Sequence, residues 1–242
     1  MKNLFIIAIS TLIISCDLAD TSITDAETRI IPDIQFTAAR NARDNSIHYL
    51  TKVYIRNEAG DELNIYNGGV WLNDIKMVPP STALFPIEDY HSYYKSTLPL
   101  NPDSLYTIKI LHSDSTESYA WIITPDIDLT VLNVPDRYPR KTALTLSWQN
   151  TDFRYPQYIH IDLYDADAEQ YKNDATLLID YPYRGTYTIS GKYIKHTNVS
   201  NNVSEEMKII LIAETLGSLD DTLPVESTIK AQFKIFKTLE IY

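Results

Sequence analysis

Along the whole chain, short segments recur in which mainly apolar residues alternate with mainly polar ones. In the longest of them, the residues of one set are Ile47, Tyr49, Thr51, Val53 and Ile55. A two-residue period places alternate side chains on opposite faces of a β-strand, whereas a helical face recurs about every 3.6 residues. The chain is rich in tyrosine (18 residues), its prolines (12) outnumber its glycines (6), and no convincing helical segment emerges. This composition favours strands, so the sequence predicts an all-β protein.

Residues 29–125 are predicted to form a first β-domain in which turn residues separate the strands. Asn67-Gly68-Gly69 indicates a hairpin, because asparagine and glycine accept positive φ. Asn73-Asp74 indicates a second turn. The domain is expected to end at Thr124-Pro125, since proline has no N–H to donate to a central ladder.

The segment from Leu98 to Tyr106 carries the most specific fold signal in this half. Two prolines, Pro99 and Pro102, precede a tyrosine at the start of a predicted strand. This arrangement resembles the tyrosine corner of immunoglobulin-like sandwiches, in which the hydroxyl bonds to backbone upstream. The resemblance implies that residues 29–125 form an immunoglobulin-like β-sandwich with Tyr106 at its corner.

The remaining residues, 126–242, contain a second set of strand patterns. A strand that ends in Trp148 is followed, after a proline-bearing loop, by alternating residues 158–164. Together with the apolar segments 207–214 and 228–239, these strands resemble the B, C, F and G strands of fibronectin type III domains. The resemblance implies a second, fibronectin type III-like β-sandwich in tandem with the first.

The N-terminus has the composition of a secretory signal, with Lys2, a short apolar run, and Ser15 before the single cysteine, Cys16. The apolar run is too short to span a bilayer as a helix. Leu-Ile-Ile-Ser-Cys resembles the lipobox of bacterial lipoproteins, which is cut before the cysteine whose sulfur takes a diacylglycerol. The resemblance implies a signal peptide at residues 1–15, and a lipidated Cys16 with a polar tether at residues 16–28. An ordinary signal peptide with a chance or buried cysteine is the alternative.

The charge of the chain restricts its partners. The formal net charge is −11, and removal of residues 1–15 takes away one lysine and leaves −12. Such a surface repels phosphate backbones, which argues against nucleic-acid binding. It also repels anionic lipid, so the acyl chains on Cys16 are the expected contact with the membrane. With Cys16 committed to lipid, no intrachain disulfide can form, and packing must stabilise the fold.

No catalytic motif is recognisable in the sequence. The five histidines fall in different predicted elements without metal-ligand spacing. Nucleophile motifs and phosphate-binding glycine loops are absent. A hydrolase would need carboxylates that converge in a cleft, for which Asp126 and Asp128 are the candidates. The sequence therefore predicts a non-enzymatic protein without a metal or a cofactor.

One acidic segment follows a predicted strand. Asp162, Asp165, Asp167 and Glu169 supply carboxylates of the kind that calcium prefers. Their spacing lacks the turn glycine of an EF-hand loop, and a solvated acidic loop is the alternative. The sequence leaves open whether the segment from Asp162 to Glu169 binds calcium.

Two tyrosine clusters are the candidate ligand-binding sites. Tyrosines on loops make rigid, amphipathic contact surfaces and stack against sugar rings. The alternative is that these tyrosines pack at strand edges or at an interdomain seam. The candidate residues are Tyr90, Tyr93 and Tyr94 in the first half, and Tyr181 and Tyr183 in the second.

These features together resemble the surface lipoproteins of Bacteroidota that carry immunoglobulin-like or fibronectin-like modules. The resemblance implies a non-enzymatic outer-membrane protein anchored through Cys16, on a face of that membrane that the sequence does not decide. Its expected partner is a glycan, preferentially a neutral one because of the net charge, or another envelope protein. A structural or fimbria-like subunit and a transporter-associated accessory lipoprotein are the alternatives.

Overall fold

The structure is a computed structural model that describes residues 22–24, 29–81, 91–127, 131–149, 154–165, 168–194 and 205–242. Within these residues the fold is all-β, as the alternating patterns predict. The helical residues described form two short 3-10 turns, η1 (Pro182–Arg184) and η2 (Gly191–Tyr193). No helix in this part of the chain is long and apolar enough to cross a bilayer.

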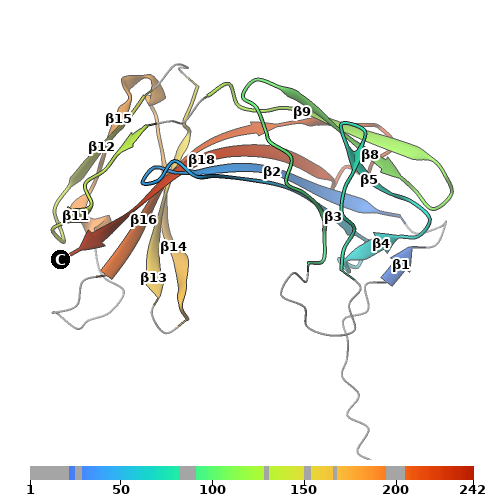
Figure 1. Cartoon of the computed structure of the whole chain (residues 1–242), viewed down its shortest axis with the longest axis horizontal. Coiled ribbons are helices and arrows are strands. Elements are labelled where there is room, and N and C mark those ends of the chain that lie inside the picture. The colour runs from blue at the N-terminus through green and yellow to red at the C-terminus, as the bar shows by residue number, and fades with distance from the viewer. Residues whose placement is uncertain are drawn as a thin grey trace, which may run out of the picture.

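One long sheet runs through the molecule (Figure 1). Its strand order is β14-β13-β16-β18-β2-β3-β7, and β11 pairs beside β18. In that order the strands are β14 (Gln170–Leu178), β13 (Tyr158–Asp165), β16 (Glu205–Leu216), β18 (Thr228–Ile241), β2 (Ile31–Asn41), β3 (Ile47–Arg56) and β7 (Tyr94–Ser96), with β11 at Arg137–Tyr138.

The centre of this sheet joins the two halves of the chain. β16 and β18 pair antiparallel along all of β16. On its other side β18 runs parallel to β2, from Asp33 opposite Thr228 to Asn41 opposite Phe236. This ladder links residues on both sides of the boundary predicted between Pro125 and Asp126. The sheet is therefore continuous across that boundary, and two separate tandem sandwiches stay a prediction.

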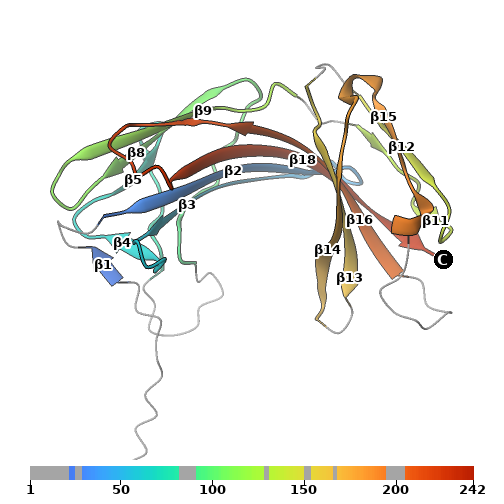
Figure 2. The ribbon, with the colours of Figure 1, turned by 180° about the vertical axis from the view of Figure 1, so that it is seen from behind.

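Smaller sheets cover the convex side of the long sheet (Figures 1 and 2). The first half is covered by a five-stranded sheet of order β17-β9-β8-β5-β6, and the second half by a three-stranded sheet of order β10-β12-β15. A further pair, β1 with β4, is parallel. The strands are β17 (Ser218–Leu219), β9 (Glu117–Ile123), β8 (Leu105–Leu111), β5 (Gly69–Leu72), β6 (Ile75–Lys76), β10 (Leu132–Asn133), β12 (Leu144–Trp148), β15 (Thr186–Ile189), β1 (Ser22–Thr24) and β4 (Leu63–Ile65).

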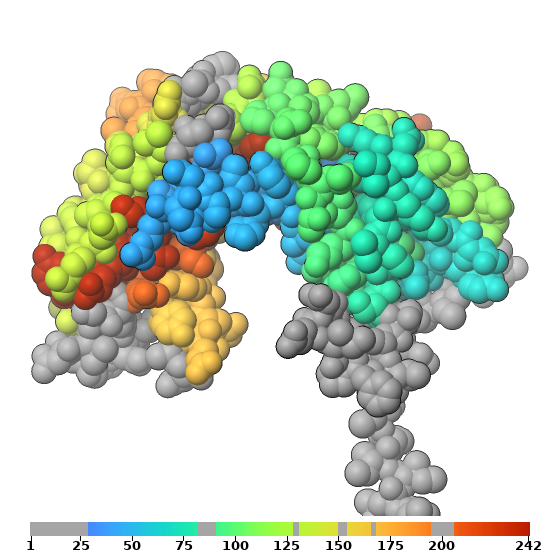
Figure 3. All heavy atoms as spheres, viewed as in Figure 1, coloured from blue at the N-terminus to red at the C-terminus, as the bar shows by residue number. Residues whose placement is uncertain are grey.

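The hydrophobic core lies between the long sheet and its covers. On β2, Ile34 and Phe36 are 0% and 1% exposed, and the Phe36 ring lies 5.8 Å from the Tyr106 ring of β8. The alternate residues Gln35 and Thr37 lie on the other face of the sheet, away from this core. The buried side chains form one cluster that spans both halves. The uncovered face of the long sheet is left as the concave side of an arch (Figure 3).

The turns and the tyrosine corner test the local predictions. The Tyr106 hydroxyl accepts a hydrogen bond from the Asn101 N–H (2.8 Å) and donates one to the Pro99 carbonyl (3.3 Å), which confirms the predicted bonding to backbone upstream. Asn73 and Asp74, at φ 45° and 65°, form the predicted turn and join β5 to β6.

The hairpin predicted at residues 67–69 is wrong, because the strands on its two sides do not pair. β4 pairs with β1, whereas β5 pairs with β6 and β8. Gly68 is required there for a different reason, since a Cβ on it would lie 2.1 Å from the Leu111 carbonyl oxygen. The glycine marks a close approach between chain segments and not a two-stranded turn.

Candidate binding surfaces

The first tyrosine cluster is divided between the core and the opposite face of the sheet. Tyr94 is 1% exposed, and its hydroxyl accepts a hydrogen bond from the Ile65 N–H (2.9 Å) and donates one to Asn64 Oδ1 (2.8 Å). Burial raises the pKa of Tyr94 to about 12. Its ring is a packing residue and offers no face to a ligand. Tyr90 lies outside the described residues.

Tyr93 is half-buried and lies among other rings. Its ring centroid is 5.1 Å from that of Tyr54 and 5.0 Å from that of His91, with which it stacks. The Lys52 ammonium lies 4.5 Å from the Tyr93 centroid, within cation–π range. Because Tyr93 and Tyr94 are consecutive, they point to opposite sides, and of the two only Tyr93 belongs to the uncovered surface.

The second cluster is exposed, as predicted for a loop site. Tyr181 and Tyr183 are 52% and 59% exposed, and their rings meet edge to face at 6.0 Å. The Arg184 guanidinium lies 4.6 Å from the Tyr181 centroid. Tyr181 and Arg184 also line a pocket of about 290 Å³ with Ile179. This cluster precedes β15 in the cover of the second half, so it does not join Tyr93 in one site.

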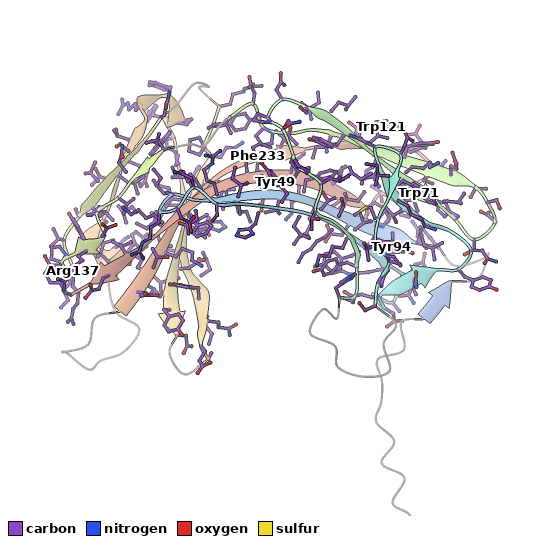
Figure 4. The ribbon with its side chains drawn as sticks, in the orientation of Figure 1. Tyr49, Trp71, Tyr94, Trp121, Arg137 and Phe233 are labelled. Atoms are coloured by element: carbon purple, nitrogen blue, oxygen red, sulfur yellow. The ribbon has the colours of Figure 1, made fainter. Side chains whose placement is uncertain are left out.

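A third aromatic surface lies on the outward side of the five-stranded cover, and the sequence analysis missed it. We call it the aromatic face. The register aligns Trp71 of β5 with Lys109 of β8, and Lys109 with Tyr119 of β9. Trp121 lies next along β9 on the same side (Figure 4). The members of the aromatic face are Trp71, Lys76, Leu105, Lys109, Tyr119, Trp121 and Ile123.

The rings of the aromatic face are held in fixed orientations. Tyr119 and Trp121 lie within 12° of parallel, with centroids 6.2 Å apart. Two ammonium groups, those of Lys76 and Lys109, lie 5.2 Å and 5.0 Å from the Trp71 ring. The Tyr119 hydroxyl donates a hydrogen bond to the Glu117 carboxylate, which lowers the pKa of Glu117 and raises that of Tyr119.

The aromatic face also exposes large apolar side chains that a core would otherwise bury. Leu105 is 60% exposed and Ile123 is 55% exposed, next to Trp121 at 37%. A signal for this surface is present in the sequence of β9. The small residues Ser118 and Ala120 are on its buried side, whereas Tyr119, Trp121 and Ile123 are on its outward side. Exposed apolar patches of this kind mark interaction sites.

Compared with these surfaces, the cavity lined by Tyr49 and Phe233 (labelled in Figure 4) is small. It has a volume of about 210 Å³ against β2, β3 and β18. Pockets that enclose small ligands usually have about 300–1,000 Å³. The open surfaces are therefore better candidates for recognition than this cavity.

Two carboxylates of the acidic segment from Asp162 to Glu169, those of Asp162 and Asp165 in β13, are engaged within the protein. Asp165 accepts hydrogen bonds from the Lys172 ammonium (2.6 Å) and the Ala168 N–H (3.1 Å), and Asp162 accepts one from the Asn173 amide (3.0 Å). Asp167, Asp128 and Cys16 lie outside the described residues. Among the residues that are described, no group of three His, Cys, Asp or Glu side chains is placed to hold a metal ion.

Comparison of the chain with family models, with curated proteins and with solved structures gave no match. The chemistry of these surfaces is therefore the guide to function. The aromatic face combines parallel rings, two cations and exposed apolar groups on a rigid sheet. It can stack against flat, weakly polar ligand faces without rearrangement.

Proposed function

We propose that the protein is a non-enzymatic, lipid-anchored envelope protein that binds a neutral glycan on the aromatic face. The observation that carries this proposal is the exposure of Trp121, Leu105 and Ile123 on the outward side of a cover sheet. These side chains are grouped on one face with further aromatic rings, and a grouped apolar surface favours a ligand that covers it.

The arrangement suits a sugar better than an extended apolar ligand. Tryptophan and tyrosine have apolar ring faces with a polar group at the edge, which matches the C–H faces and hydroxyls of a pyranose. The rings of Tyr119 and Trp121 are close to parallel and lie next to each other along β9. The Lys76 and Lys109 ammonium groups at Trp71 supply hydrogen-bond donors at the border of this surface.

Replacement of Trp71 and Trp121 by alanine is expected to lower the affinity for the glycan about thirtyfold, if these rings act as hot spots. The loss follows from the removed stacking area, while the buried phase of β5 and β9 stays intact. A neutral-glycan array followed by affinity electrophoresis measures the effect. The variant in which Tyr181 and Tyr183 are replaced by alanine is the matched control and should bind like the wild type.

Two outcomes would contradict this assignment. Wild-type protein that binds no neutral glycan removes the ligand class. Binding that is lost in the Tyr181 and Tyr183 variant, and retained in the tryptophan variant, moves the site to the second half.

The membrane part of the proposal depends on Cys16. Its sulfur is the expected lipid acceptor, so Cys16→Ala should abolish incorporation of an alkyne-bearing palmitate and release the protein from the membrane fraction. Cells expressing wild type and variant are labelled, and the protein is then immunoprecipitated for detection of the alkyne. Equal labelling of the two proteins would rule out the anchor.

The structural-subunit alternative requires a strand edge that is open to a neighbouring chain. β14 is at the end of the long sheet and has such an edge. Its exposed side chains include Lys172 and Asp174, and its pairing with β13 shifts register between Ile161 and Asp162. Charged edge residues and bulges discourage strand addition. These features favour the binding proposal over assembly through β14.

A further inference from the structure

Three lysines from two strands gather on the concave side of the long sheet. The register places Lys52 of β3 beside Gln35 of β2, and Gln35 beside Lys230 of β18. Further along β18, Lys234 lies beside the small residue Ala39. All of these side chains are on the side of the sheet that faces away from the core. We call Lys52, Lys230 and Lys234, with the residues between them, the basic concavity.

The three lysines of the basic concavity are not engaged in close ion pairs. Within the described part of the chain, none of Lys52, Lys230 and Lys234 makes an ion pair. Two carboxylates lie on the same side, those of Asp33 and Glu214. Asp33 accepts hydrogen bonds from the Gln35 amide (2.9 Å) and the Thr228 hydroxyl (2.7 Å), and Glu214 accepts one from the Gln232 amide. In a chain of net charge −11, three unpaired lysines on one sheet face are unexpected.

The pKa of Lys234 reflects the charges that lie close to it on this side of the sheet. Burial lowers the pKa of Lys234, and Lys230 and Lys52 lower it further, against the opposing effect of Glu214 and Asp162. Burial also lowers the pKa of His160 on β13, and Lys234 contributes in the same direction. A bound anion would relieve this repulsion between cations.

We infer that the basic concavity binds an acidic polysaccharide, whose carboxylates pair with Lys52, Lys230 and Lys234. Charge complementarity selects an anion, and the hollow beneath the arch in Figure 3 admits a chain that runs across the strands. A flat bilayer would not reach the floor of this hollow. The site lies on the opposite side of the first half from the aromatic face and does not depend on the function proposed there.

A glycan fits the basic concavity better than an acidic protein segment. Lysine is depleted at the centre of protein–protein interfaces, where aromatic residues and arginine dominate. Between the lysines lie neutral hydrogen-bonding groups, those of Gln35, Thr37 and Gln232, which suit sugar hydroxyls.

The net charge of the chain does not exclude such a ligand. Exposed charges separated by more than about 8 Å are largely screened at physiological ionic strength, so nearby groups dominate the potential at a site. The negative net charge argues against polyanions only as an average over the surface.

The test compares two triple variants of the chain from residue 16 that remove the same charge. In the first, Lys52, Lys230 and Lys234 are replaced by glutamine. In the control, three exposed lysines on other surfaces are replaced by glutamine, namely Lys141, Lys172 and Lys192. The probes are polygalacturonate, neutral dextran and poly-glutamate, measured by calorimetry at low and at physiological ionic strength. Thermal unfolding confirms that both variants fold.

The wild type should bind polygalacturonate more tightly than dextran, and more weakly as salt is added. The concavity variant should lose about tenfold or more in affinity for polygalacturonate, while the control stays near the wild type. Equal losses in the two variants would overturn the inference, because net charge alone would then explain binding. A preference for poly-glutamate would overturn the glycan assignment, and absence of binding to polygalacturonate would overturn the site. Loss of neutral-glycan binding in the tryptophan variant is a separate result.

Discussion

Residues 29–125 and residues 126–242, expressed as separate chains, are expected to remain unfolded, whereas the chain that contains both is expected to unfold in one cooperative step. The reason is the ladder between β18 and β2. Separation would remove one of the two strand partners of β2 and of β18. It would also uncover core next to Ile34 on one side and Ile235 on the other, both 0% exposed in the intact chain. A domain is stable by only about 5–15 kcal/mol, less than the burial that each fragment would lose.

Circular dichroism and one-dimensional NMR of each fragment, and of residues 29–242, measure this directly. The expected fragments show little dispersed signal and aggregate, because long strands with free edges are prone to association. The longer chain is the control for expression and solubility. Fragments that each fold, with their own thermal transition, would show that the tandem-sandwich prediction is right and that the shared sheet is an interface between two stable units.

Strands that are marked by residues close together in the sequence were predicted correctly. The alternation that predicted β3 and β13 and the apolar segments that predicted β16 and β18 are all local features, and the structure confirms these strands. The strand β2 was not predicted, although Ile34, Phe36 and Ala38 alternate in it. Its partner β18 lies at the other end of the chain, and no local pattern reveals such pairing. The local patterns therefore contained no sign of the ladder that joins the two halves of the chain.

For single side chains in the candidate sites, too, the local sequence does not determine which partners they meet. Alternation indicates that neighbouring residues face opposite sides, but it does not say which side is the core. Tyr93 and Tyr94 therefore looked equivalent in the sequence, and only the pairing of β7 with β3 places Tyr94 opposite buried Val53. Trp71 and Trp121 were overlooked for the converse reason, since tryptophan in a strand is usually a core residue. The lysines of the basic concavity come from strands that are distant in sequence, and the fold alone brings them together.

Substitution of Gly217 by alanine is expected to destabilise the protein by about 3 kcal/mol or more, at the upper end of the cost of overpacking. Gly217 follows β16 where the chain crosses to β17 in the cover sheet. A Cβ at this position would lie 2.2 Å from the Trp121 carbonyl oxygen and 2.9 Å from Ile229 Cγ2. The oxygen belongs to backbone that pairs with β17, so it can move only if the ladder between β9 and β17 is distorted. Urea unfolding of the variant and of the wild type gives the change in free energy.

Gly60→Ala is the matched control, because its cost has a different physical origin. Gly60 has a φ of +90°, but a Cβ there would meet no atom within 4 Å. Alanine at this turn therefore carries only backbone strain, of about 1–2 kcal/mol. Similar urea midpoints for the two variants would mean that the backbone at Gly217 accommodates the added Cβ without disturbing either sheet. A large decrease in the free energy of unfolding for the Gly217 variant alone would instead show that the aromatic face is held rigidly on the long hairpin of β16 and β18. The reason is that Trp121 pairs with β17 immediately beside this glycine.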